Sequence, residues 1–436
     1  MELSEKIAVL SAAAKYDASC ASSGSGKAGG GFSGMKGEGG RRRGASYGAT
    51  LPAGVCHSWT EDGRCVSLLK VLYSNVCRFD CSYCVNRASA DTRRASFTTE
   101  ELITLTCEFY RRNYIEGLFL SSGIFADPDI VMEKLVGAAR KLRTEAGFGG
   151  YIHLKIIPGS GEKLIREAGL WADRLSANIE LPTDKSLQRL APQKSGKVIF
   201  GAMEEVSAAE KENSEDRRRR RAFHPGREAP VFAPAGQSTQ LIVGVSAEND
   251  RQIITLSGAL YRKFFLRRVY YSAYTPVGVP GGGGIPDPRL PELSGPPLAR
   301  EHRLYQADWL LRFYHFSPEE ILEGGSTHLD IQVDPKTAWA LRHPERFPVE
   351  LGRADYEELL RVPGVGATSA RRIVEQRRSR SLSYEGLRRI GVVLKRARYF
   401  ITVGGVAADS LDDPGRVRRA IANTDGAGLQ LPLFDF

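Results

Sequence analysis

The chain has 436 residues, which leaves room for about two or three domains and a substantial core. Its formal net charge of +10 fits a polyanionic partner, and its seven cysteines, an odd number, argue against a disulfide framework and for a reducing, cytoplasmic compartment. The acidic N-terminus is unlike a secretory signal, and without an apolar run of about 18 residues no membrane span is expected.

The N-terminal region, residues 1–55, divides into two parts. Residues 4–16 predict a short amphipathic helix. From Ser22 to Ala49 the composition is so rich in Gly, Ser, Lys and Arg that the segment cannot bury a core. We expect a solvated, flexible segment, with ordering on a ligand or on nucleic acid as the alternative.

Strand-like and helical patterns then alternate along the chain. Strands are predicted at Val66–Tyr73, Gly117–Ser121, Tyr151–Ile157, Arg174–Glu180, Thr239–Val245 and Arg267–Ala273. Helices are predicted at 98–113, 129–145, 161–169, near 185–212, 249–265 and 300–314. The β-then-α series predicts an α/β fold with a parallel sheet and helices outside. Ligands bind such sheets at the C-terminal ends of the strands.

Residues 195–235 interrupt this rhythm. They contain five consecutive arginines, Arg217 to Arg221, flanked by acidic residues and followed by prolines. Such a block is typical of a solvated, basic surface insertion. A nucleic-acid arm is the alternative.

Three cysteines, Cys77, Cys81 and Cys84, follow the first predicted strand with C-x₃-C-x₂-C spacing. Thiolates this close together on one loop suit an iron–sulfur cluster, and three ligands for four irons leave one iron open. Zinc usually takes four ligands, with a second C-x₂-C or a His pair downstream, and no such pair follows. Three buried thiols without a metal are the other alternative.

This spacing, with Tyr83 just before the last cysteine, resembles the radical S-adenosylmethionine (SAM) enzymes. The resemblance implies a [4Fe–4S] cluster whose open iron binds SAM, and cleavage of SAM to a 5′-deoxyadenosyl radical by an electron from the cluster. It also implies a partial (β/α)₆ TIM-like barrel, here over residues 56–299. An electron donor such as a flavodoxin or ferredoxin would supply the electron that reduces the cluster.

The resemblance also points to SAM-binding residues at the predicted strand ends. Ser121, Ser122 and Gly123 lie where the superfamily has a Gly-rich motif for the SAM amino group. Gly244 resembles the glycine of the adenine-binding strand, and glycine within a strand often marks the close approach of a ligand.

Polar residues of two neighbouring predicted strands face the same interior. Alternation puts Ser176, Asn178 and Glu180 on one face, in a segment that resembles the polar strand that meets SAM. A buried hydrogen-bond network without a ligand is the alternative. His153 and Lys155 share a face of the preceding strand and have either a structural role or a substrate contact.

The remaining cysteines carry weaker signals. Cys20, Cys56, His57 and Cys65 could together form a second metal site, but their spacing is not recognisable, and buried or idle thiols are the alternative. Cys107 lies in the middle of a predicted helix and is expected to belong to the core.

Two helical segments around a Pro363–Gly366 turn predict a helix-hairpin-helix within an all-α domain over residues 346–405. Such a turn leaves backbone N–H groups free to bind a phosphate without reading a base. Ile390 to Val392 resembles a degenerate second hairpin. Residues 351–400 hold 12 Arg or Lys against 5 Asp or Glu. The predicted contacts to nucleic acid, DNA favoured, are Gly364, Val365, Gly366, Thr368, Arg371 and Arg372; a protein–protein hairpin is the alternative.

Residues 300–345 are predicted to form a helical connector, and residues 406–436 a tail. The tail ends in Gln430, Leu431, Leu433 and Phe434, spaced as in the peptides by which bacterial DNA-processing proteins dock on the replication sliding clamp. A strand that caps the protein's own core is the alternative.

Together these features resemble a bacterial family of radical SAM proteins with a C-terminal helix-hairpin-helix, associated with DNA modification or repair. The resemblance implies a radical SAM enzyme that acts on nucleic acid. The competing hypotheses are an RNA-modifying radical SAM enzyme and a redox-sensing iron–sulfur DNA-binding protein without turnover.

Overall fold

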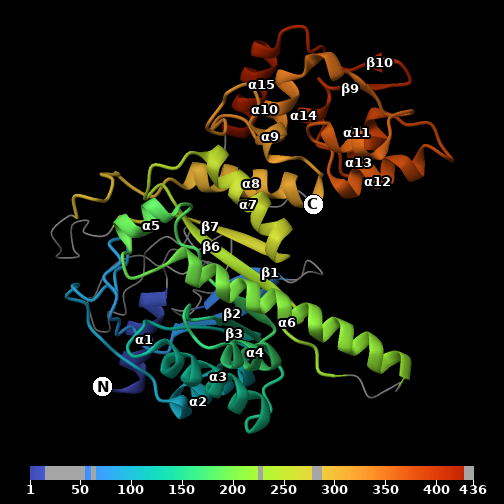
Figure 1. Ribbon diagram of the computed structural model, residues 1–436. Helices are drawn as coiled ribbons and strands as arrows, with labels where there is room; N and C mark the ends of the chain where they lie inside the picture. The colour runs from blue at the N-terminus through green and yellow to red at the C-terminus, as the bar shows by residue number, and fades with distance from the viewer. Residues whose placement is uncertain (15–54, 60–64, 224–228, 277–286, 427–436) are drawn as a thin grey trace, which may run out of the picture. The chain divides into compact units, whose positions relative to one another are not determined.

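The computed structural model describes residues 1–14, 55–59, 65–223, 229–276 and 287–426 (Figure 1). Contacts within the chain define two compact units. The first comprises Met1–Val245 and Phe264–Gly295, and the second Ser246–Lys263 and Pro296–Phe436. The predictions for residues 22–49, for Cys20 and for the peptide 430–434 lie outside the described residues.

A seven-stranded sheet forms the centre of the first unit, with its strands in chain order from β1 to β7. β1 (Val55–Trp59) pairs antiparallel with β2, and all the later pairs are parallel. The six parallel strands curl into an open half-barrel, as the β-then-α pattern predicts (Figure 1). They are β2 (Cys65–Leu72), β3 (Gly117–Ser121), β4 (Tyr151–Lys155), β5 (Arg174–Ser176), β6 (Gln237–Val243) and β7 (Arg268–Ala273).

Helices between the strands begin at clear capping residues. Thr98 and Glu101 form a capping box at α2, and Asp127 caps α3, which has proline at its first position. Buried Val131, Leu135 and Leu142 give α3 one apolar face. The helices of this unit are α1 (Leu3–Ala14), α2 (Thr99–Arg111), α3 (Pro128–Thr144), α4 (Glu162–Trp171), α5 (Asp184–Leu190) and α6 (Gly196–Phe223).

The region from 185 to 235 differs from the sequence prediction. Two helices, α5 and α6, are found where one was predicted, because Pro192, two residues after the end of α5, cannot continue that helix. A solvated insertion is wrong for the first half of α6, where Ile199, Met203 and Val206 are buried. The arginine run continues the same helix as its exposed second half, which projects from the sheet in Figure 1.

The second unit is mostly helical, but it contains a small sheet, so the prediction of an all-α domain over residues 346–405 is wrong in this respect. The fully buried Trp339 of α10 packs edge-to-face with Phe316 and Phe347. The sheet has the order β10-β9-β8, with β8 (Val349–Glu350), β9 (Ile401–Val403) and β10 (Val406–Ala407). The helices are α7 (Asp250–Phe264), α8 (Leu298–Phe313), α9 (Pro318–Ile321), α10 (Pro335–Arg342), η1 (Pro344–Arg346), α11 (Tyr356–Arg361), α12 (Ala367–Gln376), α13 (Tyr384–Arg389), α14 (Leu394–Ala397) and α15 (Pro414–Gly426).

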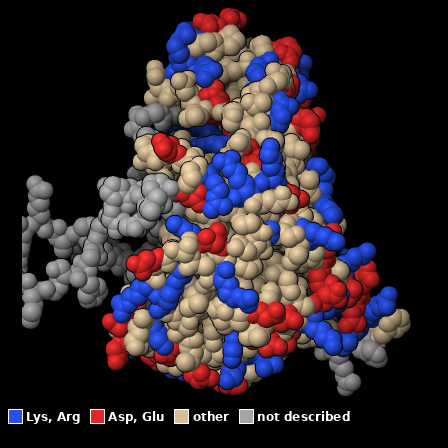
Figure 2. Space-filling view, turned by 60° about the vertical axis from the view of Figure 1, so that its left-hand side comes forward, with Lys and Arg blue, Asp and Glu red and all other residues tan. Residues whose placement is uncertain are grey.

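Charged side chains of both signs occur on one face of the molecule. Lys and Arg side chains are interspersed with Asp and Glu over the face shown in Figure 2, so the net charge of +10 is not confined to one patch of that face. Across the described ranges, no helix is both long enough and apolar enough to cross a lipid bilayer.

Candidate functional site

The Cys loop, residues 74–90, leaves the C-terminal end of β2 and carries three free thiols. Cys81 is buried, whereas Cys77 and Cys84 are half-buried. The backbone ties the start of this region to the next strand, because the N–H of Tyr73 donates to the carbonyl of Ser121 at 2.8 Å. The three cysteines therefore lie at the edge of the sheet where ligands of parallel α/β proteins bind.

Gly123 fixes the position of the loop against the end of β3. Its N–H donates to the carbonyl of Ser74 at 2.7 Å, and a Cβ atom at this position would lie 2.4 Å from the carbonyl oxygen of Val76. Only glycine allows this approach, so the predicted Gly-rich segment packs directly on the Cys loop. The hydroxyl of Ser122 donates to the Gly123 carbonyl at 2.8 Å, and Ser121 is buried.

Arg94 holds the loop in place from within. Its guanidinium donates to the carbonyls of Asn75 and Asn86 at 2.7 and 2.9 Å through one nitrogen, and to those of Arg87 and Ala90 at 2.7 and 3.1 Å through the other. The planar fork of an arginine suits such convergent acceptors. Sequence reasoning missed this residue, because no local pattern marks an arginine that folds back on its own loop.

Burial governs the protonation of the thiols. It raises the pKa of Cys81, and it raises that of Cys84 to about 12 against the opposing effect of the Asn86 N–H, which donates to the Cys84 sulfur at 3.3 Å. Both groups are therefore neutral thiols until a metal displaces their protons.

The donor set fits an iron–sulfur cluster. Within the described ranges, no group of three or more His, Cys, Asp and Glu side chains is arranged to hold one metal ion. In a [4Fe–4S] cluster each cysteine binds a different iron, so three soft thiolates on one loop can serve it without converging on a single point.

A buried ion pair stands beside the Cys loop. The Lys194 ammonium donates to the Glu180 carboxylate at 2.9 Å and lies 5.8 Å from the centroid of the Tyr83 ring. A second lysine, Lys155, lies 3.9 Å from the same carboxylate oxygen. Burial acts to lower the pKa of Lys194, but the Glu180 carboxylate, Tyr83 and Cys81 together outweigh it, so the pKa lies above its ordinary value. No sequence pattern marks Lys194, which lies between α5 and α6.

The polar residues after β5 already have protein partners. Ser176 is within hydrogen-bonding distance of His153 Nε2 at 2.9 Å, and the amide of Asn178 donates to the side chain of Gln240 at 3.2 Å. β5 ends at Ser176, so Asn178 and Glu180 lie beyond the strand that was predicted to carry them. Glu180 adopts a left-handed φ of 61°, which turns the chain there.

Gly244 does not lie within a strand. β6 ends at Val243, and Gly244 follows it with a φ of 86°, a conformation that favours glycine. The predicted strand Thr239–Val245 is therefore wrong at this end, because the chain turns at Gly244.

The residues proposed for a second metal site are only partly described. Cys56 and His57 lie on β1 and Cys65 begins β2, with His57 opposite Ser67 in the register. Their side chains lie outside the description. Cys107 is half-buried on α2.

Residues 71–217 match the family described as the Radical SAM superfamily. Among curated proteins, none matches the sequence.

Three solved structures are distantly similar. The crystal structure of HydG, a maturase of the [FeFe]-hydrogenase, is 14% identical with a TM-score of 0.38, over 55% of this chain and 48% of that one. HydG from Carboxydothermus hydrogenoformans is 15% identical with a TM-score of 0.35, over 47% and 44%. The radical SAM methyltransferase TsrM from Kitasatospora setae, with cobalamin and a [4Fe–4S] cluster bound, is 12% identical with a TM-score of 0.32, over 46% and 35%.

The match thus spans about half or less of these chains. The family match covers the end of β2, the Cys loop and the elements as far as α6. The chain therefore carries a domain of the Radical SAM superfamily over residues 71–217, a family whose members use a [4Fe–4S] cluster and SAM.

Proposed function

We propose that the protein is a radical SAM enzyme that acts on nucleic acid in the cytoplasm, with DNA as the favoured substrate and nucleotide modification or repair as the reaction. When bound, the cluster and SAM supply a 5′-deoxyadenosyl radical that abstracts a hydrogen atom. The residues that would hold them are Cys77, Cys81 and Cys84 for the cluster, and Tyr83, Ser121, Ser122, Gly123, Ser176, Asn178, Glu180 and Gly244 for SAM.

The chain's own residues prepare this site in two ways. The Lys194 ammonium donates to the Glu180 carboxylate and holds it in place, so that this carboxylate can accept hydrogen bonds from the amino or hydroxyl groups of a ligand. Burial of Cys81 and Asn178 keeps water from the interior of the half-barrel, which protects a reactive intermediate.

Two glycine turns that face each other carry the nucleic-acid part of the proposal. Gly364, between α11 and α12, has a φ of 80°, and Gly391, between α13 and α14, has a φ of 94°. The N–H of Val393 donates to the Gly364 carbonyl at 2.9 Å, and a Cβ on Gly364 would lie 2.5 Å from the Val393 carbonyl oxygen. The close approach of the turns requires glycine at Gly364.

The start of α12 has the properties of a phosphate-binding terminus. Gly366 is its N-cap residue, and no side chain caps the helix. Thr368, Arg371 and Arg372 are exposed on this helix. The small core that supports the turn is also formed, since Val362, Val365, Ala370 and Ile373 are all buried.

Binding through phosphates makes a specific prediction for affinity. Affinity of the reconstituted protein for duplex DNA should fall steeply with salt and be similar for unrelated sequences. Arg371→Gln should weaken binding to all sequences alike and reduce the salt slope by about one, whereas Arg353→Gln, in an exposed residue outside the turns, should not. Binding that is insensitive to salt would contradict the proposal.

Turnover identifies the substrate. Reduced, anaerobic protein with SAM should form more 5′-deoxyadenosine when the correct nucleic acid is present, and Cys77→Ala should abolish it. Duplex DNA, single-stranded DNA and transfer RNA are compared side by side, because phosphate contacts do not separate DNA from RNA. Stimulation by transfer RNA alone would establish the RNA alternative. The peptide 430–434 would bring the enzyme to the replication sliding clamp.

A further inference from the structure

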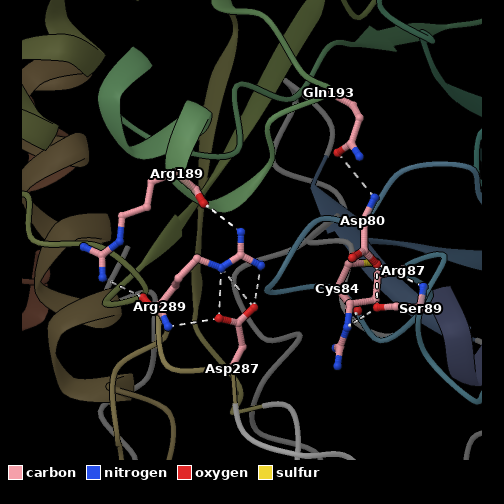
Figure 3. A network of polar contacts seen from close by, with 8 residues as sticks. All are labelled: Asp80, Cys84, Arg87, Ser89, Arg189, Gln193, Asp287 and Arg289. Carbon is pink, nitrogen blue, oxygen red and sulfur yellow. Dashed lines mark hydrogen bonds and ion pairs between the residues drawn. The ribbon is translucent and has the colours of Figure 1, made fainter.

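Four arginines lie on the Cys loop or on segments next to it, and we call them the arginine rim. They come from three separate segments: Arg78 and Arg87 from the loop itself, Arg189 from α5, and Arg289 from the segment after β7. Arg78, Arg189 and Arg289 are exposed and Arg87 is half-buried. Figure 3 shows three of them, with Asp80 and Cys84 of the loop.

Reciprocal hydrogen bonds join two of these segments. The Arg189 guanidinium donates to the Arg289 carbonyl at 3.0 Å, and the Arg289 guanidinium donates to the Arg189 carbonyl at 3.1 Å (Figure 3). The Arg189 segment also contacts the loop, because the Ser82 N–H donates to the carbonyl of Leu190 at 2.8 Å. The rim is thus one assembled surface of the first unit.

The rim keeps an excess of positive charge. The Asp80 carboxylate accepts hydrogen bonds from the hydroxyl and the N–H of Ser89, at 2.6 and 3.0 Å. Asp287 is bound to Arg289 at 2.6 Å. Four arginines against two carboxylates leave a net charge of +2.

This charge lies directly beside the cluster ligands. Arg78 follows Cys77 in the chain, and the Arg87 guanidinium lies 3.5 Å from the carbonyl oxygen of Cys84. Val76, on the other side of Cys77, is exposed by 38%, which adds apolar surface. Protein interfaces commonly combine an apolar centre with a charged rim that steers the partner.

We infer that the arginine rim is the docking site of a small acidic one-electron donor protein of the flavodoxin or ferredoxin kind. The donor loses one electron and the cluster gains it, and no atom is transferred. A donor on the rim would lie against the loop that holds the thiolates, and its acidic surface would complement the arginines.

Nucleic-acid phosphate is the competing occupant of the rim. It suits this surface less well, since Arg289 is already engaged by the Asp287 carboxylate and Arg189 by a carbonyl, which leaves fewer free N–H groups for a bidentate phosphate contact. A protein partner is attracted by the positive electrostatic potential of the arginines, and this attraction does not require unpaired N–H groups.

The test uses the reconstituted full-length protein without nucleic acid, so that its outcome does not depend on the substrate. The double variant Arg78→Glu with Arg189→Glu reverses two rim charges. The double variant Arg78→Gln with Arg189→Gln neutralises the same two charges without adding negative ones. Arg111→Glu is the matched control. This exposed residue is the last of α2 and precedes the N-terminal end of β3, whereas the Cys loop follows the C-terminal end of β2. Bleaching of the cluster by reduced flavodoxin is followed by stopped flow, and binding of oxidised flavodoxin by surface plasmon resonance.

The Glu variant should lower the rate of reduction by flavodoxin about tenfold at low salt, weaken flavodoxin binding and flatten the salt dependence. The Gln variant should have a smaller effect, and Arg111→Glu none. Photoreduced deazaflavin, a small uncharged reductant, should reduce all variants equally. Unchanged reduction and binding by flavodoxin would overturn the inference, as would equal slowing with deazaflavin. Loss of duplex DNA binding with normal donor kinetics would overturn it too, and assign the rim to phosphate.

Discussion

Lys194 and Glu180 form an ion pair inside the first unit, 2.9 Å from ammonium nitrogen to carboxylate oxygen. The pair joins the segment between α5 and α6 to the segment after β5, and the lysine also lies over the ring of Tyr83 in the Cys loop. Breaking a buried pair by removing one partner leaves the other charge unsatisfied, which is costly. Lys155, at 3.9 Å, is too far to replace the lost hydrogen bond.

Lys194→Met should therefore destabilise the protein by about 3 kcal/mol, because the Glu180 carboxylate stays buried without its closest partner. It should also make the reduction potential of the cluster more negative, since a nearby cation favours the more negatively charged reduced state. Guanidinium unfolding and an EPR-monitored redox titration measure the two effects. Lys197→Met, at an exposed lysine of α6, is the control. Equal stability of both variants would refute the role of the pair.

Gly123→Ala should prevent normal cluster assembly. Its new Cβ would stand 2.4 Å from the Val76 carbonyl oxygen, and the backbone on both sides would have to move, taking Cys77 with it. Iron and sulfide per chain after anaerobic reconstitution should drop well below the wild-type content. Gly137→Ala, on α3, where a Cβ would meet nothing within 4 Å, should keep full content and gain up to about 1 kcal/mol of stability. Full iron content in Gly123→Ala would contradict this account of the loop.

Arg94→Lys should loosen the Cys loop while keeping its charge. A lysine offers a single ammonium group and cannot span the four carbonyls that the guanidinium bridges at 2.7 to 3.1 Å. Proteolysis within residues 74–90 of the metal-free protein should become faster, and cluster loading slower. Arg93→Lys, next to it but exposed and paired with Glu5 at the surface, should change neither rate. If both variants behave alike, the fork geometry is not what holds the loop.

The sequence was most informative where function and topology leave a local pattern. The spacing of Cys77, Cys81 and Cys84 could be read directly, because one loop supplies all three, and the strand Gly117–Ser121 was predicted to the residue because a continuous apolar run is typical of a buried parallel strand. Both signals depend on neighbours in the chain, which sequence reasoning can see.

Contacts between distant segments leave no such pattern. Lys194 contacts Glu180 because α5 ends at Leu190 and the chain after it lies next to the segment that follows β5. Short strands such as β8 and β10, with two residues each, also leave no pattern in the sequence. They are strands because they pair with β9, and not because of the β-propensity of their residues. The arginine rim could not be predicted from the sequence for the same reason, because its members lie up to 211 residues apart, from Arg78 to Arg289.

Lys336 gives the second unit a specific dependence on pH. The side chain is buried on α10, donates to the Val365 carbonyl of the first glycine turn at 2.6 Å, and lies 4.5 Å from the centroid of the Tyr314 ring. Burial lowers its pKa to about 7, although Asp334 attracts the charge; Arg361 and Arg396 add to the lowering. In the unfolded chain the pKa returns to its ordinary value of about 10.4.

Between these two pKa values the unfolded state binds a proton that the folded state lacks. The free energy of unfolding should therefore rise with pH from about 7 towards 10, by at most about 1.4 kcal/mol per pH unit from this group. Lys336→Met should remove that part of the slope, whereas Lys395→Met, at an exposed lysine of α14, should keep it. Guanidinium unfolding of the full-length protein at several pH values gives the slopes. Parallel slopes for wild type and Lys336→Met would mean that the buried lysine stays charged, held by Asp334 and by its bond to the turn.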